Sequence, residues 1–153
     1  MRLVATGALG HLGSSLIREL ADAWPGADIV LLDNLATERY ASLDDLPASA
    51  RYQFMEADVL TADLTGIFAD ADAVIHLAAL TNTTRKDLRD RMHRVNLEGT
   101  ARVGGAGTAG EDWAPEDLSP QSPYAWWKLQ AEEFLRRLGS EEGLPFVIFR
   151  MGT

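Results

Sequence analysis

The chain has 153 residues, of which 46% are hydrophobic, and carries a formal net charge of −9 at pH 7. This length suffices for one domain with its own core. The acidic charge argues against nucleic acid or an anionic membrane as a partner, because both bind through clustered Lys and Arg. The absence of cysteine excludes disulfides, thiolate catalysis and cysteine metal sites. The first strand starts without a signal-peptide pattern and no run approaches membrane-spanning length, so we expect a cytoplasmic protein.

The strongest motif lies in the first 33 residues. A short apolar run leads into Gly7, Gly10 and Gly13, and a second apolar run, 29–32, ends at Asp33. Glycines at this spacing permit a tight strand-to-helix turn and a close approach of the backbone to a pyrophosphate, which the helix N-terminus also favours. A carboxylate at the second strand end accepts hydrogen bonds from both ribose hydroxyls and repels a 2′-phosphate. The pattern therefore predicts NAD rather than NADP.

The sequence between the turn and Asp33 has the pattern of a helix, with apolar residues at helical spacing followed by a Pro-Gly pair. These residues are Leu16, Ile17, Leu20, Trp24 and Pro25-Gly26. The order of strand, turn, helix and strand is that of a βαβ unit. The alternative is a turn of a parallel sheet that binds no cofactor.

Strand-like and helix-like segments alternate through the rest of the chain. Apolar patterns predict strands at 52–55, 73–77 and 146–149, and helices at 87–103 and 124–138. The run 73–77 is continuous, which is typical of a buried parallel strand. This alternation predicts an α/β fold with a Rossmann-like, doubly wound parallel sheet.

The glycine-rich stretch 104–110 departs from the alternation. It contains no run of the five or so β-prone residues that a parallel strand needs, although helices are predicted on both sides of it. The sequence therefore predicts either a fold without one interior strand or a chain from which a segment near 103–108 is missing.

Tyr124 and Lys128 are four residues apart at the start of a predicted helix and so lie on one face of it. A nearby ammonium, together with the positive nicotinamide ring of an oxidised cofactor, favours the phenolate and lowers the pKa of the tyrosine. A shift from about 10 to about 7 takes roughly 4 kcal/mol. Tyr124 could then remove a proton from a substrate hydroxyl. The alternative is a chance spacing, with Lys128 in solvent.

The joint order of these motifs resembles the extended short-chain dehydrogenase/reductases, in particular the NAD-dependent epimerase/dehydratase group with its UDP-glucose 4-epimerase-like members, which act on nucleotide sugars. The resemblance covers nearly the whole chain. It is carried by Thr6-Gly7-x-x-Gly10-x-x-Gly13, Leu32-Asp33-Asn34-Leu35, Asp58-Val59, His76-Leu77-Ala78-Ala79, Val95-Asn96-x-x-Gly99-Thr100, Ser122-Pro123-Tyr124-x-x-x-Lys128 and Phe149-Arg150.

The resemblance implies a set of site residues. The catalytic residues would be Tyr124 and Lys128, with Thr108 as the one nearby candidate for a family Ser or Thr that follows the strand lacking here. Asp58 and Val59 would flank the adenine, and Asn96 would stabilise the strand ends. The cofactor-binding residues would be Gly7, Gly10, His11, Leu12, Gly13, Asp33, Asn34, Thr37, Asp58, Val59, Leu77, Ala78, Ala79, Thr81, Asn96, Tyr124 and Lys128.

Simpler structural roles exist for three of these positions or their neighbours. Asp58 could form an Asx-type turn, Asn96 could be a surface amide, and His76 is best explained as a hydrogen-bonded core histidine. The other histidines, His11 and His93, have no partners at metal-ligand spacing, so no metal is expected.

The same resemblance implies that the chain would be an NAD-dependent epimerase that transiently oxidises a UDP- or dTDP-linked sugar, and that it would form a homodimer through helices 88–103 and 124–138. Family members also have a C-terminal substrate domain, which this sequence does not contain. No Thr-Asp-Glu motif of the dehydratases is present, which favours an epimerase or a dehydrogenase. A dehydratase, an NAD(P)-dependent reductase and a non-catalytic NAD-binding module remain as alternatives.

Overall fold

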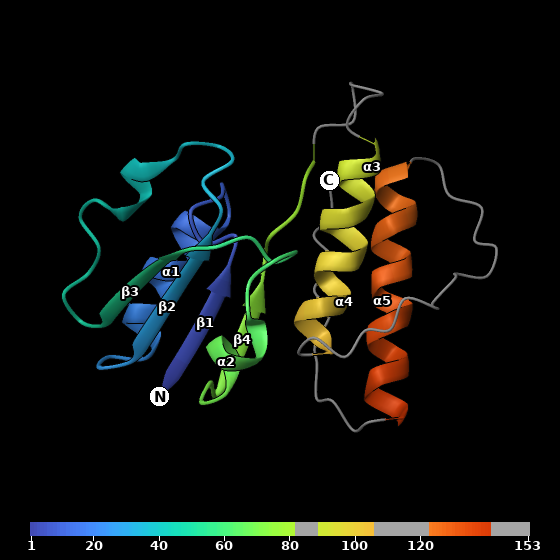
Figure 1. The fold of residues 1–153 in the computed structure, drawn as a ribbon. Helices are drawn as coiled ribbons and strands as arrows, with labels where there is room; N and C mark the ends of the chain where they lie inside the picture. Colours follow the sequence, from blue (N-terminus) through green and yellow to red (C-terminus); the bar gives the residue numbers. More distant parts are fainter. Residues whose placement is uncertain (82–88, 106–122, 142–153) are drawn as a thin grey trace. The chain divides into compact units, whose positions relative to one another are not determined.

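The computed structural model describes residues 1–81, 89–105 and 123–141. The chain divides into two units, residues 1–79 and 80–153, which are described in turn. The first unit contains a parallel sheet with short helices (Figure 1). Its elements are β1 (Arg2–Thr6), α1 (Gly13–Ala23), β2 (Asp28–Asp33), the 3-10 helix η1 (Tyr40–Leu43), β3 (Arg51–Glu56), α2 (Leu64–Phe68) and β4 (Ala73–His76).

The four strands are arranged in the order β3-β2-β1-β4, and every neighbouring pair is parallel. The chain moves outward from β1 to β3 and then returns to place β4 on the other side of β1. This reversal is typical of a doubly wound sheet, whose ligands bind at the carboxyl ends of the strands where the order reverses. The prediction of a Rossmann-like parallel sheet is confirmed.

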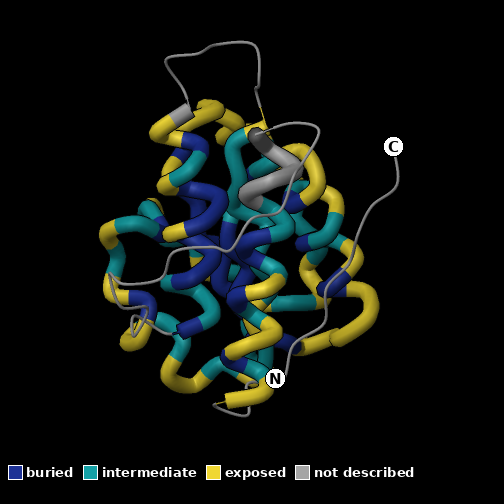
Figure 2. The backbone as a smooth tube through the Cα atoms, turned by 90° about the vertical axis from the view of Figure 1, so that its right-hand side faces the viewer, coloured by how far each residue is buried: buried dark blue, intermediate teal, exposed yellow. Residues whose placement is uncertain are grey.

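The core of the first unit forms between α1 and one face of the sheet. Ile17 and Leu20 of α1 pack against Leu3 of β1 and Ile29 and Leu31 of β2, and each of these residues is buried. The intervening residues of β1 and β2 are buried too, and Figure 2 colours the backbone by the burial of each residue. Burial on both faces explains why these strands are continuous apolar runs, each large side chain contributing about 1.5–3 kcal/mol.

Two sequence-based expectations fail in this unit. Trp24 is not on the buried face of α1: it is the C-cap residue and is 45% exposed. The strand at 73–77 is not buried throughout, since Val74 of β4 is 37% exposed. Within the described residues β4 pairs with β1 alone. The strand predicted at 146–149 lies outside the described residues.

The second unit is helical in its described parts. α3 (Arg89–His93) continues through a π-helical turn, η3 (Arg94–Glu98), into α4 (Gly99–Gly104), and α5 (Pro123–Glu141) runs alongside them (Figure 1). Both predicted helices are confirmed over the described residues: the first from Arg89, its predicted start at 87–88 lying outside them, and the second ending at Glu141 rather than near residue 138. Within the described segments, no helix has the length and apolar character needed to cross a membrane.

Candidate functional site

The glycine turn after β1 leaves no room for side chains. Gly7 has φ +66°, and a Cβ there would lie 2.6 Å from the backbone nitrogen of Ala78. A Cβ on Gly13 would lie 2.5 Å from the carbonyl oxygen of Ala8. The Gly7 N–H donates to the Leu32 carbonyl at 2.8 Å, which ties the turn to the end of β2. Glycine is therefore required here, and the bare backbone can approach a phosphate group closely.

Asp33 is fixed to the glycine turn by its own carboxylate. One oxygen accepts a hydrogen bond from the Leu9 N–H at 3.0 Å and the other from the Leu35 N–H at 2.9 Å. The residue is only 8% exposed. A carboxylate has about four acceptor sites, so two remain for other donors. This fits a ribose diol, the group expected beside the last residue of β2.

Asn34 and Asp58 join the carboxyl ends of β2 and β3. The Asn34 side-chain amide donates to one Asp58 oxygen at 3.0 Å, and the other Asp58 oxygen accepts from the Leu60 N–H at 2.9 Å. The bond from the Leu60 N–H forms the Asx-type turn that was one interpretation of Asp58. The other Asp58 oxygen faces Asn34. Contact of Asp58 with an adenine stays a prediction.

Thr6 and His76 join the carboxyl ends of β1 and β4. Thr6 is fully buried, and its hydroxyl lies 2.6 Å from Nδ1 of His76. The Thr6 carbonyl also accepts a hydrogen bond from the Leu77 N–H at 2.9 Å. The predicted hydrogen-bonded histidine is confirmed, although its side chain is only half-buried. These bonds hold the segment 77–79 against Gly7.

Asn96 has a buried anchoring role in the second unit. Its side chain donates to the Leu80 carbonyl and accepts from the Leu80 N–H, both at 2.8 Å. It is fully buried on the π-helical turn η3, so the reading of it as a surface amide is wrong. Two reciprocal bonds to one residue fix the chain shortly after β4, while a cofactor contact stays a prediction.

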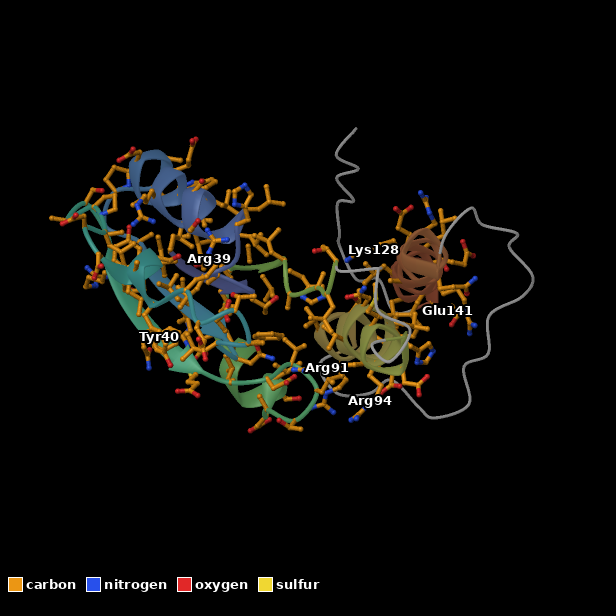
Figure 3. The ribbon with its side chains drawn as sticks, turned by 90° about the horizontal axis from the view of Figure 1, so that it is seen from above. Arg39, Tyr40, Arg91, Arg94, Lys128 and Glu141 are labelled. Carbon is orange, nitrogen blue, oxygen red and sulfur yellow. The ribbon has the colours of Figure 1, made fainter. Side chains whose placement is uncertain are left out.

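Lys128 lies in the first half of α5, four residues after Tyr124 (Figure 3). Burial lowers the pKa of Lys128, and the negative charge of Glu132 partly offsets this. Lys128 is partly buried rather than fully exposed, and a functional meaning of its spacing from Tyr124 stays a prediction. An ammonium with a lowered pKa is poorly hydrated and interacts strongly with a nearby anion.

We expect Lys128→Met to raise the free energy of unfolding at neutral pH. Burying the charge costs stability wherever Lys128 is protonated in both states. The folded pKa lies below the unfolded value of about 10.5, so this cost disappears as the pH rises through the folded pKa towards the unfolded one. The advantage of the variant should accordingly shrink towards pH 10.5, as denaturant unfolding at several pH values would show.

Arg136→Met, on an exposed position of α5, should show no such trend. A pH-independent difference for Lys128→Met would contradict this account.

The predicted site residues divide between the two units. Tyr124, Lys128, Asn96 and Thr81 belong to the second unit, and Thr108 lies outside the described residues. Those of the first unit are Gly7, Gly10, His11, Leu12, Gly13, Asp33, Asn34, Thr37, Asp58, Val59, Leu77, Ala78 and Ala79. They lie in the turn and the first residue of α1, at the last residue of β2, and in the segments that follow the strands.

Two residues of the first unit that the sequence motifs did not include also contact the turn or its helix. Ser42 bonds the carbonyl of Leu9, and Arg18 bonds that of Ser14. Ser42 is 33 residues from Leu9 in the chain, so no local pattern could reveal the contact. Among the described residues there is no group of three His, Asp or Glu side chains that could hold a metal ion.

A glycine turn between β1 and α1, with an acidic residue at the end of β2, defines a Rossmann-type dinucleotide-binding domain. The chain belongs to the 3-beta hydroxysteroid dehydrogenase/isomerase family, whose model matches residues 4–109. Its relatives and structural neighbours are extended short-chain dehydrogenase/reductases of the epimerase/dehydratase group, which confirms the resemblance drawn from the motifs.

Two relatives illustrate the similarity. The chain is 34% identical over 160 aligned residues to the UDP-glucose 4-epimerase of Mycolicibacterium smegmatis, covering 88% of this chain and 50% of that protein. It is 26% identical over 179 aligned residues to the uncharacterized UDP-glucose epimerase YtcB of Bacillus subtilis, covering 100% of this chain and 56% of the relative. The chain thus spans about half the length of these relatives.

A solved structure shows the same fold. The UDP-glucuronic acid 4-epimerase of Bacillus cereus, in complex with UDP-glucuronic acid and NAD, matches with a TM-score of 0.77 and 25% sequence identity. The match covers 95% of this chain and 54% of the epimerase.

Proposed function

We propose that the chain is the cofactor-binding part of an NAD-dependent nucleotide-sugar epimerase that transiently oxidises a sugar hydroxyl. The position of Lys128 carries this proposal. It is a lysine whose pKa is lowered by burial, one helical turn after a tyrosine, in a chain whose relatives include a UDP-glucose 4-epimerase and an uncharacterized UDP-glucose epimerase. A lysine so placed is suited to stabilise a phenolate.

The residues divide the work as follows. When bound, NAD supplies the two-electron oxidation that turns the sugar carbinol into a ketone. The glycine turn receives the pyrophosphate, and the two free acceptor sites of Asp33 receive the ribose hydroxyls. The Tyr124 phenolate takes the proton of the sugar hydroxyl, and the Lys128 ammonium stabilises that phenolate. The epimer forms when the ketone carbon regains the hydride on its opposite face and the ketone oxygen regains the proton, so that every atom removed from the carbinol is returned.

We also propose that a segment is missing from the chain between α4 and α5. The Bacillus subtilis relative aligns over 179 positions to 100% of a chain of 153 residues, so about 26 of its positions have no counterpart here. That length accommodates one strand of five or six residues with its connections. The glycine-rich stretch that follows α4 at Gly104 supports this location. The sugar-binding part would then belong to the regions of such relatives that this chain does not span.

Tyr124→Phe tests the proposed reaction in the full-length protein. Without the phenolic oxygen no base removes the sugar proton, so turnover of UDP- or dTDP-glucose should fall by about 10²–10⁴-fold while NAD binding is retained. Tyr40→Phe, at a position 57% exposed on η1, is the control and should leave turnover unchanged. Unaltered turnover in Tyr124→Phe would exclude the proposed role.

A non-catalytic NAD-binding module is the second candidate function, and the absence of a strand-like run in 104–110 favours it. Intact mass separates the two candidates. A purified natural protein of 16.7 kDa that binds NAD but converts no nucleotide sugar would support the module. A protein of about twice that mass with turnover would support the epimerase.

A homodimer through the helices 89–104 and 123–141 is part of the proposal. The cluster of Ala101, Phe134 and Leu138 between α4 and α5 holds these helices together as one packing unit, which supports their use as a common surface. Analytical ultracentrifugation at micromolar concentration tests it, and a monomer would contradict it.

A further inference from the structure

We propose that Ser42 and Arg18 are positioning residues that hold the glycine turn in its binding conformation before any cofactor arrives. Ser42 lies on η1, and its hydroxyl donates to the carbonyl of Leu9 at 3.2 Å. Leu9 is the residue of the turn whose N–H donates to Asp33. Both polar backbone groups of this buried residue are thus held by side chains from outside the turn.

Arg18 attaches η1 to α1. Its guanidinium donates to three carbonyl oxygens: that of Ser14 at 2.5 Å, that of Ser42 at 3.3 Å and that of Asp44 at 2.7 Å. Ser14 lies in the first turn of α1, and its N–H donates to the Gly10 carbonyl at 2.9 Å. Hydrogen bonds from a charged donor are stronger than neutral ones. Arg18 therefore fixes the distance between the helix start and the segment that carries Ser42.

The segment that carries Ser42 would not keep its shape without such contacts. Leu35, Glu38 and Asp45 all have positive φ, at 55°, 51° and 52°. Residues other than glycine adopt this conformation at a cost and persist in it only when their surroundings fix them. The Glu38 N–H bonds the Leu35 carbonyl at 2.8 Å, and Arg18 bonds the carbonyl immediately before Asp45. Because hydrogen bonds maintain these strained conformations, the segment is suited to position the residues that it contacts.

The consequence for binding is preorganisation. A turn that is already ordered loses little conformational freedom when a ligand binds, which raises affinity without a new contact to the ligand. The glycine turn would face the pyrophosphate of a dinucleotide, so the contribution of Ser42 should appear for ligands that contain a pyrophosphate. This inference rests on the NAD site of the proposed function.

Ser42→Ala provides the test in the full-length protein. Loss of one neutral hydrogen bond should weaken the binding of NAD and of ADP-ribose by about three- to tenfold, with a much smaller change for AMP, which has no pyrophosphate. Ser42→Thr, which keeps the hydroxyl, should restore the affinity. Ser49→Ala, at an exposed serine of the same unit, is the matched control. An equal loss for all three ligands, or no loss, would overturn the positioning role.

Amide hydrogen exchange of Leu9 and Gly10 separates this inference from the proposed function, because it needs no ligand. Exchange at both amides should be several-fold faster in Ser42→Ala, while amides of β1 and β2 remain unchanged. Arg18→Lys should act in the same direction, since an ammonium cannot reach three carbonyls in the way a guanidinium does. If the parent protein binds no NAD, the proposed function fails, and the exchange rates still decide the inference. Unchanged exchange at Leu9 and Gly10 would refute it.

Discussion

Alanine in place of Gly7 is expected to lower the free energy of unfolding by about 2–5 kcal/mol and to abolish NAD binding. Two costs add up. A residue with a Cβ at φ +66° pays about 1–2 kcal/mol for the left-handed conformation. The Cβ would also lie 2.6 Å from the nitrogen of Ala78 and 2.7 Å from the carbonyl carbon of Leu77. These are backbone atoms next to the Leu77 N–H, which donates to the Thr6 carbonyl, so relief requires the strand end to move, at about 1–3 kcal/mol.

Gly26→Ala is the matched control for this prediction. Gly26 also has a positive φ, at +84°, but a Cβ there would meet nothing within 4 Å. It should therefore pay the conformational cost alone and leave NAD binding intact. Denaturant unfolding of both variants measures the difference between their free energies of unfolding. That difference is the cost of placing a Cβ at Gly7 against the segment after β4. Equal losses in the two variants would show that this approach carries no energetic weight.

The parts of the fold that follow from local patterns were predictable. One short stretch contains the spaced glycines, the helical pattern of apolar residues and the acidic residue at the end of an apolar run. Each of these signals reflects a backbone requirement at its own position. The turn at Gly7 and the place of Asp33 at the end of β2 are accordingly as predicted. The parallel direction of the strands also followed, because alternating strands and helices allow few other arrangements.

Features that depend on contacts distant in sequence could not be predicted. The Asn96 side chain bonds the backbone of Leu80, sixteen residues earlier, and no spacing rule connects them. The exposure of Val74 depends on what packs against its face of the sheet, which its own apolar pattern does not encode. Ser42 is a polar residue in a loop-like sequence, and its bond to Leu9 becomes visible only when η1 is placed beside the turn.

Asp33 provides the second prediction of a large effect. Asp33→Ala removes the acceptors of two N–H groups, those of Leu9 and Leu35, which both belong to buried residues. A buried donor left unpaired costs about 1–3 kcal/mol, so the variant should lose about 2–6 kcal/mol of stability. Asp33→Asn keeps one oxygen as an acceptor but turns its NH₂ towards the other N–H, so its loss should be smaller. Thermal or denaturant unfolding measures whether Asp33→Ala loses more stability than Asp33→Asn.

The same pair of variants tests the choice of cofactor. A carboxylate beside the ribose repels a 2′-phosphate, and Asp33→Asn removes that charge while an amide remains in place. The preference for NAD over NADP should therefore fall in Asp33→Asn, measured as the ratio of the two dissociation constants. Asp28→Asn is the control, since Asp28 begins the same strand and bonds the exposed Arg51; it should change neither stability nor preference appreciably. A ratio that stays constant in Asp33→Asn would mean that the carboxylate serves the glycine turn alone, and that the discrimination between the two cofactors resides elsewhere.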